Sequence, residues 1–180
     1  MGNKRVTLDE LRVMARAAKN KIDHIYLHWT AGNYHQFSGD YHLCIDEDGA
    51  IIATTDDLTA FKEHTWRRNS DAIGIAMCCC AGAVAYSADN IDYGEQPPTA
   101  AQIDSMAQAV AVLCKELGLD INPHIVMTHC EAAELDGYGP STTCERWDLW
   151  ALPDVPGDGK QKPGGDVVRG KAIWWQHNGI

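Results

Sequence analysis

The sequence lacks three features that mark common classes of protein: an excess of basic residues, a long apolar run and any Cys-x-x-Cys pair. Its 25 acidic residues outnumber its 15 lysines and arginines, which gives a formal net charge of -10. A protein that binds nucleic acid or an anionic membrane surface needs a basic face, so we expect neither as a partner. No stretch approaches the roughly 20 apolar residues that a membrane span requires.

The absence of Cys-x-x-Cys pairs also excludes a zinc ribbon, which holds its metal with such pairs. The seven cysteines are odd in number, and Cys78, Cys79 and Cys80 lie in an apolar run that predicts a buried strand. We therefore expect reduced cysteines in the core. Residues 1–21 have a charged, helical pattern in place of a signal peptide. This predicts synthesis in the cytoplasm, so that a target outside the cell would be reached by delivery or after lysis.

The sequence does contain enough hydrophobic residues, 45% of 180, to build one globular core. Thr7 with Glu10 and Thr99 with Gln102 have the form of capping boxes, and each precedes apolar residues at helical spacing. Alternating or continuous apolar runs predict the strands, and Gly49 supplies a positive φ at a hairpin turn. The fold class is α/β, with helices expected over 8–19 and 99–118 and strands over 22–29, 41–46, 50–55, 72–80 and 124–128.

Two regions are expected to lie outside this core. Residues 81–98 are rich in Gly, Asp and Asn and end in two prolines, which predicts a long surface loop. Beyond Trp150 prolines and glycines become frequent, so we place a domain over 1–152 and an extension over 153–180. Within this extension, residues 167–177 would pack back on the domain as a helix or begin a linker.

Two histidines and one aspartate are candidates for a metal site. His28 and His129 each follow or end a predicted strand on its polar side, and Asp148 lies in a later loop. A catalytic zinc site needs three ligands of this kind and leaves a fourth position to water. With eight histidines in the chain, this spacing alone does not distinguish ligands from structural histidines.

Five motifs in order give a more specific indication, because together they resemble the zinc N-acetylmuramoyl-L-alanine amidases related to phage endolysins and to peptidoglycan recognition proteins. The resemblance covers about residues 22–150. It implies a central mixed β-sheet flanked by α-helices with zinc in a groove on one face, and peptidoglycan as the substrate of a catalytic domain over 1–152. The motifs are HWTAG (28–32), YHLCIDEDG (41–49), HTWRRNSDAIGI (64–75), THCE (128–131) and RWD (146–148).

The resemblance implies that His28, His129 and Asp148 bind zinc. Among nearby alternatives to Asp148, neither Cys144 nor Asp136 has a cation two residues before it, as the family pattern requires. Arg146 has that place, and its permanent charge suits a tetrahedral oxyanion. Tyr41 falls on a family active-site tyrosine. Zinc would lower the pKa of its bound water from about 15.7 toward 7.

One position departs from the family pattern. Many relatives have a glutamate after the Ile-Gly-Ile stretch, whereas this chain has Ala76. Proton transfer would therefore fall to Tyr41, to Glu131 or to zinc hydroxide alone. Glu131 has two alternative interpretations, as a residue that orients His129 or as an acidic residue at a helix N-terminus.

Three residues are expected to contact the substrate, because an indole, an imidazole and an amide suit a glycopeptide: His64, Trp66 and Asn69. Trp66 could equally close the core. His42 alternates with Tyr41 on its strand, so it is expected to be packed or hydrogen-bonded. We expect the protein to be a monomer.

Two other functions remain open. A cysteine peptidase of cell-wall peptides would use Cys44 or Cys130 as its nucleophile, although Cys44 lies inside a predicted strand, where no helix N-terminus stabilises a thiolate. A non-catalytic peptidoglycan-binding module is the other alternative. Three filled ligand positions favour catalysis over binding alone.

Overall fold

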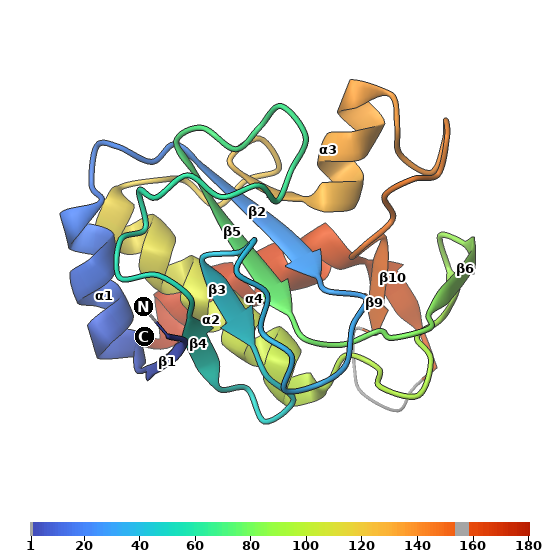
Figure 1. The fold of residues 1–180 in the computed structure, drawn as a ribbon, viewed down its shortest axis with the longest axis horizontal. Helices are drawn as coiled ribbons and strands as arrows, with labels where there is room; N and C mark the ends of the chain where they lie inside the picture. Colours follow the sequence, from blue (N-terminus) through green and yellow to red (C-terminus); the bar gives the residue numbers. More distant parts are fainter. Residues whose placement is uncertain (1, 154–158) are drawn as a thin grey trace.

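A computed structural model describes residues 2–153 and 159–180, and its centre is a mixed sheet of six strands (Figure 1). The first three strands in the sheet order pair antiparallel, and the last four pair parallel, with β3 shared between the two sets. The sheet order is β1 (Lys4–Val6), β4 (Ile51–Ala53), β3 (Leu43–Ile45), β5 (Ala72–Met77), β2 (His24–Trp29) and β8 (Val126–Thr128).

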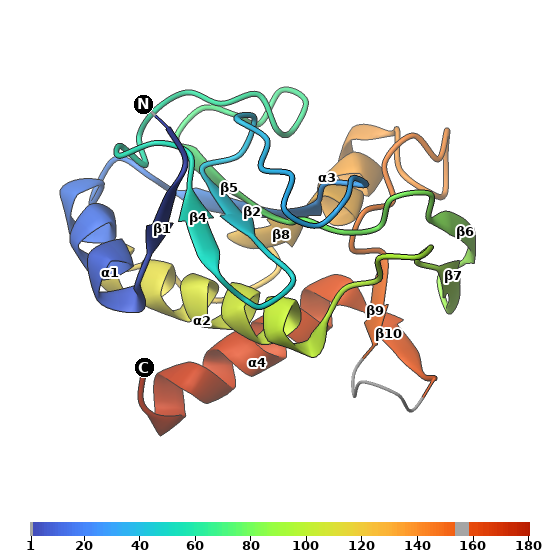
Figure 2. The same ribbon diagram turned by 60° about the horizontal axis from the view of Figure 1, so that its bottom comes forward.

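Helices cover both faces of this sheet. Figure 2 shows α1 (Leu8–Ala17), α2 (Ala100–Leu117) and α4 (Gly164–Asn178) together on one side. Ile25 and Leu27 of β2 belong to the main core on that side. The opposite face of β2 carries Tyr26, which packs with Ala132 of α3 (His129–Asp136). The expected α/β domain with a mixed sheet between helices is confirmed.

The ends of the elements follow from local residues. Capping boxes begin α1 at Thr7 and α2 at Thr99, and Gly118 ends α2 in the left-handed conformation. Gly49 has φ +82 in the turn between β3 and β4, where a Cβ would lie 2.7 Å from the Ser105 hydroxyl. Both the backbone angle and the close approach of α2 therefore require glycine there.

Several elements differ from the sequence prediction. β1 adds an edge strand that the sequence pattern did not indicate. β5 ends at Met77, so Cys78, Cys79 and Cys80 follow the strand, although all three are buried free cysteines. The segment expected to be a loop over 81–98 contains a hairpin of β6 (Val84–Ser87) and β7 (Asn90–Asp92). The two strands have four and three residues and are largely accessible, too short for an apolar alternation to reveal them.

The C-terminal part continues the core beyond Trp150. β9 (Ala151–Pro153) pairs antiparallel with β10 (Gln161–Pro163), and α4 then packs along α2. Val168 and Ala172 of α4 are fully buried in the main core. Residues 154–158 of the predicted extension lie outside the described residues. Within the described ranges, none of the helices has the length and apolar character needed to cross a membrane.

Candidate metal centre

Three side chains from distant parts of the chain meet beside the sheet, and we call them the His-His-Asp cluster: His28, His129 and Asp148. His28 is next to the last residue of β2, and His129 is the first residue of α3. Asp148 lies in the turn before β9. All three are buried, with exposed fractions of 0%, 7% and 8%.

The ligand atoms of this cluster converge on one point. The Nδ1 atoms of His28 and His129 lie 3.1 Å apart. The Asp148 carboxylate places Oδ2 3.2 Å from His28 Nδ1 and Oδ1 3.5 Å from His129 Nδ1. Two imidazole nitrogens this close repel each other unless a proton or a cation lies between their lone pairs.

These separations fit the coordination of a small metal ion. Zinc binds imidazole nitrogen and carboxylate oxygen at about 2.0–2.2 Å, so two tetrahedral ligands lie about 3.3 Å apart. The three separations in the cluster are 3.1, 3.2 and 3.5 Å. The donor set and its spacing therefore suit a metal, and the cluster could hold one.

The outer nitrogen of each histidine has its own partner. His28 Nε2 lies 3.4 Å from the Thr65 hydroxyl, and His129 Nε2 lies 3.3 Å from the Tyr138 hydroxyl. If each Nε2 donates to its hydroxyl, both Nδ1 atoms present lone pairs to the centre. Because a hydroxyl can accept such a bond, both contacts are compatible with the tautomer that binds metal.

The surroundings of the cluster also favour the forms of the side chains that bind metal. It lowers the pKa of His28, which keeps this imidazole neutral near pH 7. For Asp148, burial acts to raise the pKa, but its close contacts with the imidazoles of His129 and His28 outweigh it and hold the pKa well below its usual range. A neutral imidazole and an ionised carboxylate are the forms that a metal requires.

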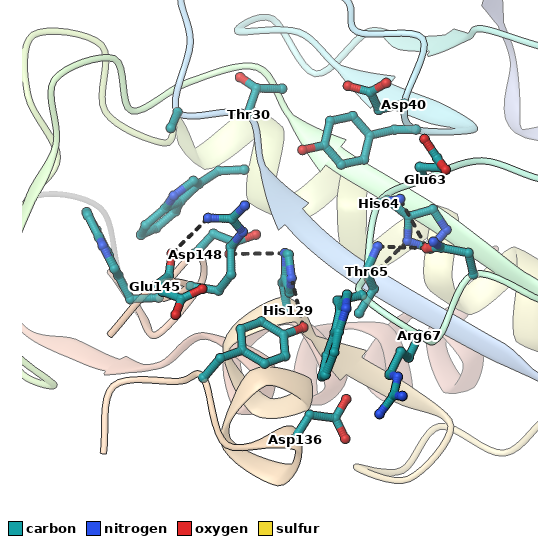
Figure 3. A pocket seen from close by; sticks show the side chains of 18 of the residues that line it. Thr30, Asp40, Glu63, His64, Thr65, Arg67, His129, Asp136, Glu145 and Asp148 are labelled. Atoms are coloured by element: carbon teal, nitrogen blue, oxygen red, sulfur yellow. Dashed lines mark hydrogen bonds and ion pairs between the residues drawn. The ribbon is translucent and has the colours of Figure 1, made fainter. Parts of the chain in front are cut away.

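The cluster opens into a cavity of about 930 Å³, whose wall includes His129 and Asp148. Figure 3 shows the labelled side chains around it, with His129 and Asp148 between Glu145 and Thr65. Asp40 and Asp136 lie at opposite margins of this view. A cavity of this size accommodates a ligand larger than a single sugar or amino acid.

Tyr41 and Arg146 both line this cavity. The Tyr41 ring lies 5.0 Å from the His28 ring, centroid to centroid. Burial is the main cause that raises the pKa of Tyr41, so its hydroxyl stays protonated at neutral pH. Arg146 is exposed, and its Nη1 donates to the Glu145 carbonyl at 2.9 Å. The structure therefore brings both residues to the same space as the cluster.

Of the three expected substrate contacts, Trp66 is the most accessible. It is 55% exposed, packs edge-on against Tyr138, and has the Arg67 guanidinium 4.7 Å above its ring. Asn69 also lines the cavity, but its Oδ1 accepts from the backbone N–H groups of His64 and Thr65 and so shapes this loop.

His64 lines the cavity and is 7% exposed. Its Nδ1 lies 3.0 Å from the Thr65 hydroxyl, and its Nε2 has no hydrogen-bond partner among the described residues. Its ring packs on Gly74, where a Cβ would come within 2.6 Å of it. Burial is the main cause that lowers the pKa of His64, to about 2. His64 is therefore a neutral residue beneath the cavity wall, linked to His28 through Thr65.

The structure does not bring Glu131 to the cluster. Its Oε2 accepts from the Thr128 backbone N–H at 2.8 Å, in a capping box that begins α3. Both carboxylate oxygens also accept from Arg169 at 2.8 Å. Glu131 is absent from the described residues that line the cavity. The geometry matches an acidic residue at a helix N-terminus, and the helix that it caps begins at His129.

The competing ligand and nucleophile candidates also lie elsewhere. Asp136 pairs with Arg68 through contacts of 2.7 and 2.9 Å, and Cys144 is exposed outside the cluster. Cys44 and Cys130 are buried, and neither thiol is among the described residues that line the cavity. His42 is fully buried, and its ring nitrogens bond to the Ala60 carbonyl and the Gly74 N–H.

Ala76 stands where the resemblance led us to expect a glutamate. It lies in parallel register with His28 on the neighbouring strand, so both side chains project from the same face of the sheet. Ala76 is fully buried. A carboxylate here would have stood directly beside His28, and the chain has none at this place.

Sequence reasoning missed Tyr138 and the function of Thr65. Tyr138 follows Gly137, which ends α3 with φ 82 and turns the chain back toward the cluster. A helix-ending glycine eight residues after a candidate ligand indicates a return of the chain, but it does not identify which later side chain meets the histidine. Thr65 belongs to the motif over 64–75, but nothing in that motif indicated that its hydroxyl would contact His28.

A family model and a solved structure are similar to this chain. The model of the N-acetylmuramoyl-L-alanine amidase family matches residues 18–149, a span that contains the entire cluster. Among solved structures, the chain is similar to the endolysin N-acetylmuramoyl-L-alanine amidase LysCS from Clostridium intestinale URNW. That similarity has 17% sequence identity and a TM-score of 0.46, and it covers 62% of this chain and 71% of that chain. No curated protein sequence matches the chain.

Proposed function

The chain belongs to the N-acetylmuramoyl-L-alanine amidase family, and we therefore propose that it hydrolyses the amide bond between N-acetylmuramic acid and L-alanine in peptidoglycan. The observation that carries this proposal is the convergence of three buried ligand atoms beside a cavity of about 930 Å³. Family membership supports the reaction, and the cluster supports a catalytic over a purely binding role.

We propose that the metal is zinc, held by Nδ1 of His28, Nδ1 of His129 and a carboxylate oxygen of Asp148. Two imidazoles and one carboxylate form a donor set that zinc hydrolases use, with a fourth position left free. When bound, zinc supplies a Lewis acid for the scissile carbonyl and a water nucleophile at neutral pH. The remaining steps depend on residues of the chain itself.

Arg146 is the proposed partner for the oxygen that gains negative charge during attack on the amide. It lines the cavity as a cation that cannot lose its proton at neutral pH. Its charge also reaches the cluster, since it contributes, after burial, to the lowered pKa of His28. A fixed positive charge at this place favours the transition state over the neutral substrate.

Tyr41 is proposed to act as a hydrogen-bond donor. Its raised pKa keeps the hydroxyl protonated, so it can donate to the carbonyl oxygen but is a poor general base. With Ala76 in place of a carboxylate and Glu131 held by Arg169, neither position supplies a base to the cluster. We therefore propose that the water nucleophile depends on the metal for its activation.

The exposed wall of the cavity is proposed to hold the glycopeptide. Trp66 offers an indole face that suits a sugar or a peptide backbone, and Arg67 above it adds a cation. His64 and Asn69, predicted as substrate contacts, are proposed to act mainly by shaping the loop that presents Trp66.

The test is release of material from purified peptidoglycan. The intact protein should solubilise it, a chelator should abolish the activity, and added zinc should restore it, while thiol alkylation has no effect. Full activity in excess chelator that is lost on alkylation would favour the cysteine peptidase. Binding to peptidoglycan without release would favour a non-catalytic module.

A further inference from the structure

The start of α4 packs against the two segments that carry His129 and Asp148, although α4 lies beyond the family match, which ends at residue 149. Figure 1 shows α4 beginning beside β9 and β10. Its contacts with β8 and β9 bring it to the ends of both segments. The three residues involved are Gly164, Gly165 and Arg169.

Arg169 contacts the segment that leads into His129. It is 5% exposed, and its Nη1 donates to the Val126 carbonyl of β8 at 2.9 Å. Nη1 and Nη2 also donate to the two oxygens of Glu131, each at 2.8 Å, and Nη2 donates to Asp166 at 2.9 Å. A planar guanidinium that makes two parallel bonds fixes the orientation of its carboxylate partner.

Glu131 connects Arg169 to the backbone on either side of His129. The same Oε2 that meets Arg169 accepts from the Thr128 N–H at 2.8 Å, and the Thr128 hydroxyl accepts from the Glu131 N–H at 3.1 Å. His129 lies between these two residues as the first residue of α3. Its backbone is therefore held by a capping box whose carboxylate is itself held by α4.

Two glycines allow α4 to approach this closely. A Cβ on Gly165 would lie 2.4 Å from Glu131 Oε1 and 2.6 Å from Arg169 Nη1. A Cβ on Gly164 would lie 2.2 Å from the carbonyl oxygen of Leu149, the residue directly after Asp148. Neither position has a positive φ, so close approach alone accounts for the need for glycine.

We infer that Arg169 is a positioning residue for the metal centre, and that the start of α4 sets the placement of His129 and Asp148. This inference rests on the proposed zinc site. Arg169 would contribute to metal affinity without touching the metal, because it determines where the α3 N-terminus stands relative to His28 on the sheet. Groups that orient a metal ligand through hydrogen bonds commonly change the metal affinity by about 10–100-fold, and Arg169, which acts through Glu131, is expected at the lower end of that range.

The test measures zinc affinity of the intact protein by competition with a chromogenic chelator. Gly165→Ala and Arg169→Met should each weaken zinc binding about tenfold or more. Gly170→Ala is the matched control for Gly165→Ala. Gly170 lies on the same helix, and a Cβ there would meet nothing within 4 Å. Arg16→Met is the control for the second, because Arg16 makes a two-bond ion pair with Glu116 away from the cluster. The zinc affinity of both controls should stay within about twofold of that of the unchanged protein.

Unfolding midpoints of the metal-free proteins and the absorption spectra of their cobalt forms separate positioning from general destabilisation. A variant that only loses stability would have a lower midpoint with unchanged affinity and spectrum, and this result would overturn the inference. If Arg169→Met fails to fold, Arg169→Lys and Gly165→Ala provide the comparison. Failure of the unchanged protein itself to bind zinc would instead refute the zinc site on which the inference rests.

Discussion

The Nδ1 atoms of His28 and His129 lie 3.1 Å apart, although 101 positions separate the two residues in the chain. The parallel pairing of β2 with β8 produces this meeting, because it brings the end of β2 to the point where α3 begins. With Asp148 Oδ2 at 3.2 Å, the arrangement requires a cation or a proton at its centre.

Asp148→Ala should remove most bound zinc and activity, because the carboxylate is one of three converging ligands. Cys144→Ser and Asp136→Asn should keep full zinc content, since both residues lie outside the cluster. Zinc per protein, measured by atomic emission after gel filtration, checks this. Loss of zinc from Cys144→Ser with retention in Asp148→Ala would show that the ligand assignment is wrong.

Arg146→Ala should keep its zinc but lower kcat by about 10²–10³-fold, the usual effect of removing one partner of an oxyanion. Arg67→Ala is the matched control, because Arg67 is also an exposed arginine that lines the cavity, with its charge over Trp66. It should change KM more than kcat. Equal losses of kcat in the two variants would argue against a specific role for Arg146.

Tyr41→Phe should retain zinc and folding, since the ring still packs 5.0 Å from His28, but kcat should fall by about 10²-fold. The cause would be loss of the hydroxyl that donates to the carbonyl oxygen. Steady-state kinetics on a defined muropeptide measure this effect. An unchanged kcat would remove Tyr41 from the mechanism.

Stability should rise with pH between about 4 and 6.5, in part because of His42. Burial is the main cause that lowers the pKa of His42, from 6.5 to about 4. In this interval His42 binds a proton in the unfolded chain but not in the folded protein. The contribution of His42 to the free energy of unfolding is therefore fully present above pH 6.5 and is lost as the pH falls toward 4. The shift corresponds to about 3 kcal/mol at about 1.4 kcal/mol per pH unit.

His42→Gln should therefore be less stable at pH 7 but show a shallower loss between pH 6.5 and 4.5. Its amide can still donate to the Ala60 carbonyl, which accepts from His42 Nε2 in the unchanged protein. Denaturant unfolding at several pH values, with chelator present in all samples, measures the slope. His124→Gln, at an exposed position, is the control. Parallel slopes for His42→Gln and the unchanged protein would contradict the assignment.

Local signals in the sequence predicted much of the fold. Capping boxes at Thr7 and Thr99, and the turn at Gly49, depend on neighbours within four residues, and all three form as expected. The strands with apolar periodicity were also found, because burial of one face leaves a pattern in the sequence. The β6–β7 hairpin and β1 are short and largely accessible, so they leave no such pattern.

The cluster residues could be named from five ordered motifs, but their partners could not. Arg169 meets Glu131 across 38 positions, and neither residue has a sequence pattern that indicates the other. Glu131 was a candidate for proton transfer because it stands two residues after His129. Only the packing of α4 shows that its carboxylate is held by an arginine and a helix N-terminus.

The bond that the protein cuts tests the central claim most directly. Mass spectrometry of peptidoglycan digested by the intact protein should show free stem peptides with a new L-alanine amino terminus and glycan strands of unchanged length, because the proposed metal site attacks an amide and not a glycosidic carbon. New reducing sugar ends without free alanine amines, or cleavage within the stem peptide, would contradict the proposed amidase activity.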